Sequence, residues 1–312
     1  LIERIDEGER GGSEKDREAL LEFSDRLSLL RSEYSVHRHE KLLRHCTIIS
    51  ENVGGLAEAL EDKGAAESIV RWINREYTNE ETNKDYRIAL RMFGKRVAEV
   101  RDDIPTNEKG VPDSLTWVPT TTSRSYDPKP NPGEMLDWEE DVRPLIDATL
   151  KARDGALIAV AWDAGPRAGE LLDLTVGDVS DHKHGLQISV DGKRGQRSIM
   201  LITAVPYLSQ WLNDHPRKND SGAPLWCKLQ SGEEISYQMA RKAVRSAARR
   251  AGISKPVNFT NFRASSASYL ASQGVNQAVL ESHQGWKTGS AVAGRYVSVL
   301  SEASDREVAR AH

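Results

Sequence analysis

The chain has 312 residues, of which 38% are hydrophobic and 29% are charged, and its formal net charge is −4. This length suggests two domains or one large domain, and the hydrophobic share is sufficient for real cores. The negative net charge excludes a protein that binds nucleic acid through bulk positive charge. Any nucleic-acid surface must therefore be local and offset by acidic residues elsewhere in the chain.

The sequence shows no sign of a membrane or of an oxidising compartment. No apolar run approaches the roughly 20 residues of a membrane helix, and residues from Glu3 onward are charged, unlike a secretory signal. The two cysteines, Cys46 and Cys227, show neither a metal-ligand spacing nor a disulfide framework. We therefore expect a cytoplasmic protein with packed, reduced thiols and no membrane partner.

The first part of the chain is predicted to be a helical domain. Residues 1–13 are charged and contain glycine, so we expect a flexible lead-in there. Over residues 14–104, apolar residues recur at steps of three and four, which is typical of helices with one buried face. After a first helix from Glu14, further helices are expected over 36–50 and over 56–77.

The clearest amphipathic helix of this domain spans residues 82–101. Besides its apolar stripe it carries a basic stripe at steps of three and four, made of Lys84, Arg87, Arg91 and Lys95. This stripe predicts a row of phosphate contacts along a DNA backbone. The alternative is a solvated face that pairs with Glu80 or Glu99.

A proline-rich stretch follows over residues 105–136 and shows no periodicity. Its prolines are Pro105, Pro112, Pro119, Pro128, Pro130 and Pro132. This composition predicts an extended, semi-stiff linker and the best domain boundary in the chain. A linker of this length suits two domains that must close around something wide.

The second domain is predicted to span residues 137–312 and to mix helices with a small sheet. Helices are expected over 142–151, 156–163 and 205–213. Residues 185–190 and 198–202 have the β-branched content and alternation of strands. The D-G-K-R-G-Q turn between them puts Lys193 at a hairpin tip.

A strongly basic helix is expected over residues 237–252. Arg241, Arg245 and Arg249 recur at steps of four along it, with Lys242 beside them. This concentration of charge favours a DNA-contacting helix. The alternative is an ordinary solvated face.

Cleaving a phosphodiester without a metal requires three kinds of group. A nucleophile attacks phosphorus, cationic donors hold the non-bridging oxygens, and an acid protonates the leaving oxygen. Arginine suits the second task because its planar guanidinium can bind two phosphate oxygens. Lysine at a hairpin tip suits the third, and tyrosine suits the first where a cationic pocket stabilises the phenolate.

Residues of these kinds occur in a set of motifs that follow one another along the chain. They are the block G-P-R-A-G-E over 165–170, the lysine hairpin, a second arginine, a glycine-tryptophan pair and a G-R-Y-V segment. In type and order these motifs resemble those of the tyrosine recombinase (phage-type integrase) family, whose first block is a glycine-x-arginine-x-x-glutamate helix start. The resemblance implies that the catalytic residues are Arg167, Lys193, Arg263, Trp286 and Tyr296. It also implies that Glu170 braces Arg167.

The resemblance covers nearly all of 137–312 and, by general pattern, 14–104. It implies a mainly α fold with a small antiparallel β-sheet. A helical core-binding (SAM-like) domain over 14–104 would clamp DNA, and an α+β domain over 137–312 would carry the catalytic residues. The implied partners are a double-stranded DNA attachment or recombination site and further copies of the chain, as a tetramer on DNA. Accessory DNA-bending factors are compatible with this arrangement.

The implied reaction is site-specific DNA recombination or integration. Tyr296 attacks the scissile phosphate, forms a 3′-phosphotyrosyl link and frees a 5′-hydroxyl, while Lys193 protonates the leaving oxygen. The link conserves the bond energy, so the resemblance implies no cofactor and no metal. The protein would act at the nucleoid, or in the host cytoplasm if a virus encodes it. The C-terminal half looks more like archaeal plasmid or virus integrases than like bacterial chromosome-dimer resolvases.

One position departs from the family pattern. The family commonly has histidine three residues before the second arginine, and here that residue is Thr260. A threonine hydroxyl can bind a phosphate oxygen but cannot act as a base near neutral pH. Either water or His283 is then left to take the proton of the tyrosine.

Two other functions fit the same sequence. A type IB topoisomerase or a telomere resolvase would use the same chemistry on other DNA substrates. A non-catalytic DNA-binding protein on a decayed recombinase scaffold would fit the replacement at Thr260. A covalent adduct with DNA separates the enzymes from the binding protein.

Overall fold

The structure is a computed structural model that describes residues 1–30, 32–33, 35–123, 131–192 and 195–289. The chain forms two compact units, Leu1–Asp127 and Pro128–His312. The division falls inside the stretch expected to separate two domains. None of the helices in the described part of the chain has the length and apolarity to cross a membrane.

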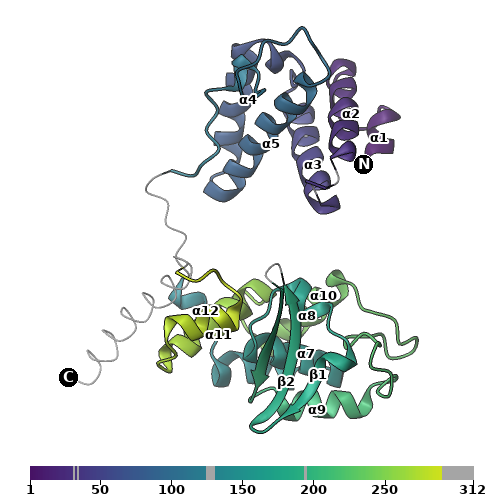
Figure 1. Ribbon diagram of the computed structural model, residues 1–312, viewed down its shortest axis with the longest axis vertical. Coiled ribbons are helices and arrows are strands. Elements are labelled where there is room, and N and C mark those ends of the chain that lie inside the picture. Colours follow the sequence, from purple (N-terminus) through teal and green to yellow (C-terminus); the bar gives the residue numbers. More distant parts are fainter. Residues whose placement is uncertain (31, 34, 124–130, 193–194, 290–312) are drawn as a thin grey trace, which may run out of the picture. The chain divides into compact units, whose positions relative to one another are not determined.

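In the described part of the first unit, the regular structure is helical (Figure 1). Its α-helices are α1 (Ile2–Asp6), α2 (Glu14–Leu29), α3 (Val36–Asn52), α4 (Lys63–Glu76) and α5 (Glu80–Ala98). Two short 3₁₀ turns, η1 (Glu58–Leu60) and η2 (Asp113–Leu115), complete it.

Helices α2, α3 and α5 pack against one another and form the core of this unit. Phe23 on α2 meets Phe93 on α5 edge to face, with 5.5 Å between ring centroids. The helices begin where the sequence offers capping side chains. Ser13 and Asn79 each accept a hydrogen bond from a backbone N–H of the first turn, of α2 and α5 respectively.

The structure differs from the expectation of a flexible lead-in over residues 1–13. Ile5 on α1 is only 1% exposed and belongs to the core. Ser50 on α3 donates its hydroxyl to the carbonyl of Gly11 at 2.8 Å, and Arg10 forms an ion pair with Glu51. The buried isoleucine and these contacts with α3 fix residues 1–13 to the first unit, although their composition is otherwise typical of a loop.

The expected extended linker over residues 105–136 is largely packed. Val111, Leu115 and Val118 are buried in the first core. Ser114 donates its hydroxyl to the carbonyls of Ala59 and Leu60, at 2.7 and 2.8 Å. The residues up to 123 therefore belong to the first unit, because the apolar residues spaced among the prolines pack against its core.

The end of the same stretch is fixed to the second unit. Asn261 donates from Nδ2 to the carbonyl of Glu134 at 2.8 Å. The backbone N–H of Leu136 donates to the hydroxyl of Ser265 at 2.9 Å, and Leu136 is buried in the second core.

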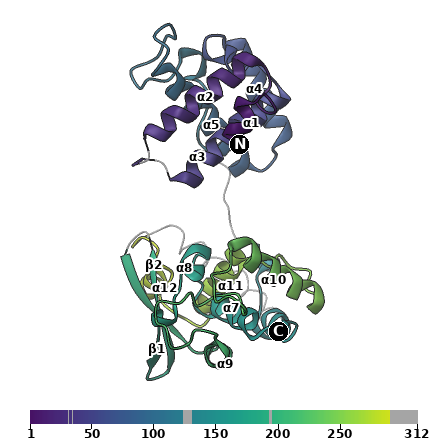
Figure 2. The ribbon, with the colours of Figure 1, turned by 90° about the vertical axis from the view of Figure 1, so that its right-hand side faces the viewer.

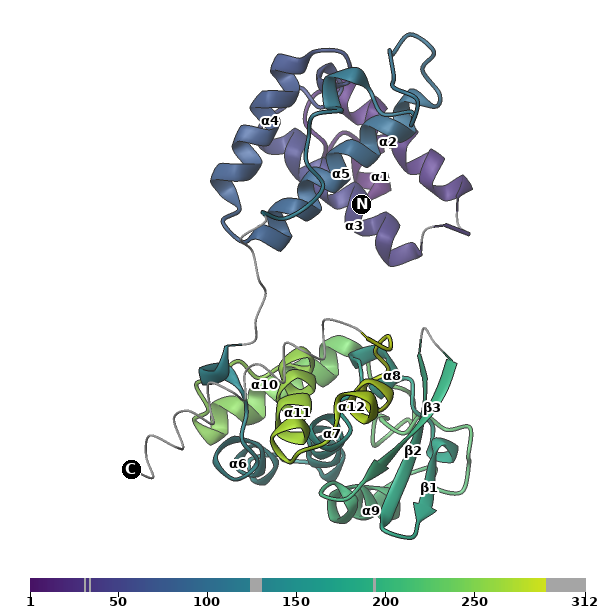
Figure 3. The same cartoon turned by 60° about the vertical axis from the view of Figure 1, so that its left-hand side comes forward.

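The second unit combines helices with one sheet (Figure 3). Its α-helices are α6 (Arg143–Asp147), α7 (Ala152–Asp163), α8 (Ala168–Leu172), α9 (Val205–Asp214), α10 (Tyr237–Ala251), α11 (Phe259–Ser272) and α12 (Gln277–Gln284). A π-helix, η4 (Trp138–Val142), leads into α6, so the helix expected over 142–151 starts earlier and ends at Asp147. Short 3₁₀ turns occupy η3 (Pro132–Glu134) and η5 (Val176–Asp178).

Three antiparallel strands form the sheet in the order β1-β2-β3. They are β1 (Val179–His182), β2 (Gly185–Gly192) and β3 (Gly195–Leu201). The β2–β3 register ends at the pair Gly192–Gly195, which confirms the predicted hairpin. The sequence analysis missed β1, because its four residues are largely polar and exposed.

Helix α7 lies at the centre of the second unit. Residues 155–162 are all buried, and α7 contacts α6, α9, α10 and α11. Figure 2 shows α7 beside α11 and α10, and in Figure 3 α12 lies between α11 and β3. The predicted mainly α fold with a small antiparallel sheet is confirmed.

We expect Gly94→Ala to destabilise the first unit. A methyl group on Gly94 would collide with Leu115 and lie 3.1 Å from Cγ of Pro112. Alanine gains about 1 kcal/mol in helix propensity, but overpacking a core costs about 1–3 kcal/mol. Thermal unfolding should show a lower Tm for G94A. Gly169→Ala, where nothing lies within 4 Å of the added carbon, should leave the Tm equal or higher.

Candidate active site

Arg167 stands at the start of α8, directly after a sharp turn. Gly165 adopts a left-handed backbone with φ of 55°, and Pro166 follows it. The backbone N–H of Arg167 donates to Oε2 of Glu170 at 2.9 Å, and its Nη1 donates to Oε1 at 2.6 Å. The three-residue spacing read from the sequence thus gives a direct brace between the two side chains.

Glu170 is a buried carboxylate with two arginine partners. Its side chain is 5% exposed, and Oε2 also pairs with Nη2 of Arg197 at 2.7 Å. Burial alone would raise the pKa of Glu170. Hydrogen bonds from Arg197 and from the backbone and side chain of Arg167 outweigh burial and lower the pKa to about 2. The carboxylate is therefore charged at any physiological pH.

Arg263 reaches the same place from α11. Its Nη1 donates to the carbonyl of Gly165 at 2.8 Å, and its Nη2 donates to the carbonyl of Gln284 at 2.5 Å. Its guanidinium carbon lies 5.5 Å from the ring centroid of Trp286, a cation–π distance. Trp286 itself packs against α11 and α12.

The turn after α12 is where the two arginines meet. Gly285 ends α12 in a left-handed conformation with φ of 62°, which directs the carbonyls of Gln284 and Gly285 toward them. Arg167 donates from Nη2 to the carbonyl of Gly285 at 3.3 Å, one residue after the carbonyl that Arg263 holds. The Arg167 side chain is 42% exposed, so it can still bind an anion such as a phosphate.

Two of the expected catalytic residues, Lys193 and Tyr296, lie outside the described residues. The strand ends that flank Lys193 are described, and they lie beside the site. A carbon added to Gly192 would come within 2.7 Å of Oε1 of Glu170. The last residue of β2, directly before the lysine, therefore lies against the carboxylate that braces Arg167.

The residues expected to support proton transfer have different surroundings. Thr260 is exposed in the first turn of α11, three residues before Arg263. Burial and the nearby Arg197 lower the pKa of His283 to about 4, although a hydrogen bond with the backbone of Ala164 acts in the opposite direction. His283 is thus neutral near pH 7 but a weak base, since an effective base titrates close to the working pH.

The sequence analysis missed Arg197. This arginine lies on β3 and shares the inward face with Ile199 and Leu201. It pairs with Glu170 and donates from Nε to the carbonyl of His283 at 3.1 Å. The signal was present in the strand alternation, because a charged residue at an inward position requires a buried partner.

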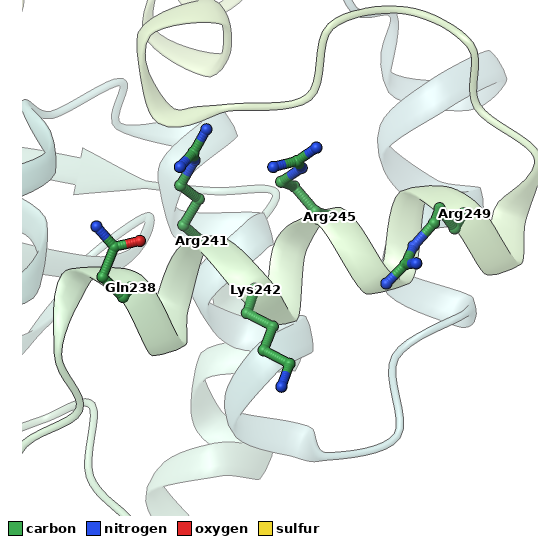
Figure 4. Close-up of a pocket in the computed structure, with 5 residues that line it drawn as sticks. All are labelled: Gln238, Arg241, Lys242, Arg245 and Arg249. Carbon is green, nitrogen blue, oxygen red and sulfur yellow. The ribbon is translucent and has the colours of Figure 1, made fainter.

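The basic side chains of helix α10 extend into solvent (Figure 4). Gln238, Arg241, Lys242, Arg245 and Arg249 line a shallow pocket on it. In Figure 4, Arg241 and Arg245 extend from one side of the helix and Lys242 from the other. Among the described residues, none of these four cations forms an ion pair with a carboxylate, which leaves them available to an external anion.

The basic stripe on α5 is used differently. Lys84 pairs with Glu81. Arg87 is buried and donates to the carbonyl of Thr121 at 3.2 Å, while Arg91 donates to the carbonyl of Val118 at 3.0 Å. The expected row of phosphate contacts stays a prediction, and in this structure Arg87 and Arg91 also bind the backbone of residues 118–121.

Lys95, the last residue of the α5 stripe, is partly buried, and its side chain approaches Gly110. Like Arg87 and Arg91, it lies next to the segment that follows α5. The stripe thus helps to fasten residues 104–123 to the first unit.

Comparison with known proteins identifies the family. A model of the phage integrase family matches residues 138–302, about half of the chain. The chain therefore belongs to the phage integrase family, as its motifs indicated.

The curated relatives match over part of their length. Tyrosine recombinase XerD of Pseudomonas putida is 28% identical over 160 residues, which cover 49% of this chain and 53% of that protein. Tyrosine recombinase slr0733 of Synechocystis sp. is 32% identical over 114 residues, which cover 35% of this chain and 36% of that protein. The chain thus spans about half or less of the length of the curated relatives it matches.

Solved structures show the same fold at low identity. A lambda integrase dimer bound to a COC′ core site is 14% identical, with a TM-score of 0.65 over 88% of this chain and 76% of that one. XerH recombinase in a post-cleavage complex with palindromic difH is 17% identical, with a TM-score of 0.61 over 93% and 95%.

We expect Glu170→Gln to lower the free energy of unfolding at neutral pH. In acid, the difference in this free energy between the variant and the wild type should become smaller. The pKa of Glu170 in the folded chain, about 2, lies below its ordinary value of 4.5. Its stabilisation, about 3 kcal/mol, is full above the ordinary pKa and is lost as the pH falls through the folded pKa. Urea unfolding across this range measures the difference. Glu139→Gln, at an ion pair with a 64% exposed glutamate, should change little.

Proposed function

We propose that this chain breaks and rejoins DNA strands at specific sites through a covalent link between Tyr296 and DNA. The observation that carries this proposal is the meeting of Arg167 and Arg263. Their guanidinium groups come from α8 and α11 and hold consecutive carbonyls beside Trp286. Two convergent guanidiniums suit the non-bridging oxygens of a scissile phosphate, on which negative charge builds during attack.

In the proposed reaction the phenolate oxygen of Tyr296 forms a bond to phosphorus, and the bond from phosphorus to the 5′ oxygen breaks. Lys193 gives a proton to that oxygen, which leaves as a 5′-hydroxyl. The tyrosine's own proton passes to water, with His283 as a weaker candidate because of its low pKa. A 5′-hydroxyl of a partner strand then reverses the step, so the bond energy is conserved.

Trp286 has a supporting role in this scheme. Its ring packs under the Arg263 guanidinium and against α11, which limits the positions that the arginine can take. Glu170 acts in the same way on Arg167. Thr260, exposed one turn before Arg263, can add a hydroxyl donor to a bound phosphate.

Double-stranded DNA is the proposed substrate, and the whole chain would clamp it. The exposed cations of α10 are the strongest candidate for backbone contacts in the second unit. The first unit would serve as the helical core-binding domain. Four copies would act together on a recombination site, in the cytoplasm or at the nucleoid. Among structural neighbours, a lambda integrase tetramer is described as bound to a Holliday junction, and XerH as bound to its difH substrate.

The direct test uses a suicide DNA substrate that traps the cleaved strand. We expect wild-type protein to form a covalent protein–DNA adduct and Tyr296→Phe to form none, because phenylalanine has no oxygen to attack phosphorus. Tyr269→Phe is the matched control, since Tyr269 is an exposed tyrosine on α11. An adduct that persists in Y296F would assign the nucleophile elsewhere, and no adduct in the wild type would reject catalysis.

A second test concerns α10. We expect R241A/R245A to weaken DNA binding and to reduce the slope of log affinity against log salt by about 2, since each phosphate contact contributes about one. Filter binding over a salt series measures both. Arg143→Ala removes an exposed arginine that already pairs with Glu139, so its slope should match wild type. An unchanged slope in the double variant would remove α10 from the DNA surface.

A further inference from the structure

Arg197 joins three separate elements of the second unit. It extends from β3, pairs through Nη2 with Glu170 on α8, and donates from Nε to the carbonyl of His283 on α12. These partners lie 27 and 86 residues away in sequence. One guanidinium thus holds the start of α8 and the end of α12 against the strand that follows the lysine hairpin.

The space around this guanidinium is shaped to admit it. A carbon added to Gly285 would lie 2.9 Å from Cζ of Arg197, and one added to Gly192 would lie 3.1 Å from its Nη1. At such distances a side chain at either position would force Arg197 or Glu170 to shift. The two glycines let the backbone of β2 and of the turn after α12 approach the arginine closely.

Arg197 differs from the two arginines assigned to phosphate. Its side chain is only 15% exposed, against 42% for Arg167, and its Nη2 and Nε already donate to Glu170 and to the His283 carbonyl. It therefore has little capacity to hold a phosphate itself. Its position suits a residue that acts through Glu170.

The carboxylate of Glu170 is divided between the two arginines. Oε1 accepts from Nη1 of Arg167, while Oε2 accepts from Nη2 of Arg197 and from the backbone N–H of Arg167. Holding Oε2 fixes the plane of the carboxylate, and the plane fixes where Oε1 directs the Arg167 guanidinium. Without Arg197, both oxygens would be held by Arg167 alone, and the carboxylate and Arg167 could shift together relative to β3 and α12.

We propose that Arg197 is a positioning residue for strand cleavage, which fixes Arg167 through Glu170 and ties the lysine hairpin to both. The inference rests on the proposed function. Arg197 touches neither DNA nor the reacting atoms in this scheme. It holds β3, α8 and α12 in fixed relative positions, so that a phosphate meets Arg167 and Arg263 at once.

The test compares Arg197→Ala with Gln196→Ala on the full chain. We expect R197A to cleave a suicide substrate about 100-fold more slowly, the cost of a misplaced catalytic group, while its affinity for uncleaved DNA stays at the wild-type value. Gln196 is the exposed neighbour on the same strand, and Q196A should keep both rate and affinity. A loss of rate without a loss of affinity separates positioning from DNA binding.

A double-mutant cycle tests the route through Glu170. We expect R197A/E170Q to cleave no more slowly than the slower single variant, because both changes disrupt the same brace. Fully additive losses would overturn the proposal, as would an R197A chain that folds and cleaves at the wild-type rate. Thermal unfolding reports whether R197A folds.

Arg197→Lys decides the question if R197A does not fold. Lysine keeps a positive charge near Glu170 but lacks the fork that reaches two acceptors at once. We expect R197K to cleave more slowly than wild type at unchanged affinity, and a wild-type rate would overturn the proposal. Failure of wild-type protein to form an adduct overturns the proposed function and this inference together. A wild-type chain that cleaves beside an equally active R197A overturns only the inference.

Discussion

The ion pairs of Glu170 are the interaction on which the candidate site depends. A carboxylate taken out of water loses several kcal/mol of solvation, and only well-placed charged donors offset that loss. Here the donors are Arg167 and Arg197, which come from different elements. The two ion pairs of this buried carboxylate therefore link α8 to β3. They also place the ends of β2 and β3, which flank Lys193, beside the site.

Backbone carbonyls complete the arrangement. Arg263 and Arg167 bind the carbonyls of Gln284 and Gly285, and Arg197 binds that of His283, so the last turn of α12 offers three successive acceptors. A helix C-terminus leaves such carbonyls without partners inside the helix. Its negative dipole end also favours cations. The end of α12 thus acts as a common anchor for three guanidiniums that would otherwise repel one another.

Local patterns in the sequence were sufficient for much of this description. The Arg167–Glu170 spacing predicted a contact within one helical turn, and the hairpin glycines predicted the β2–β3 turn. Contacts between distant elements were not accessible in this way. Arg197 meets Glu170 only because the fold brings β3 within side-chain reach of α8, and two arginines of the α5 stripe bind carbonyls of residues 118–121 that follow the helix. Residue type and spacing indicate which contacts a side chain can make, whereas tertiary packing determines which partner it meets.

The attachment of residues 131–136 has a practical consequence for anyone who wishes to isolate the second unit. The family match begins at residue 138, yet Asn261 and Ser265 on α11 bond to the backbone of Glu134 and Leu136. A fragment trimmed to the family boundary would strip both partners from the helix that carries Arg263. It would also uncover the apolar surface that Leu136 fills. An expression fragment should therefore start upstream of Asn131.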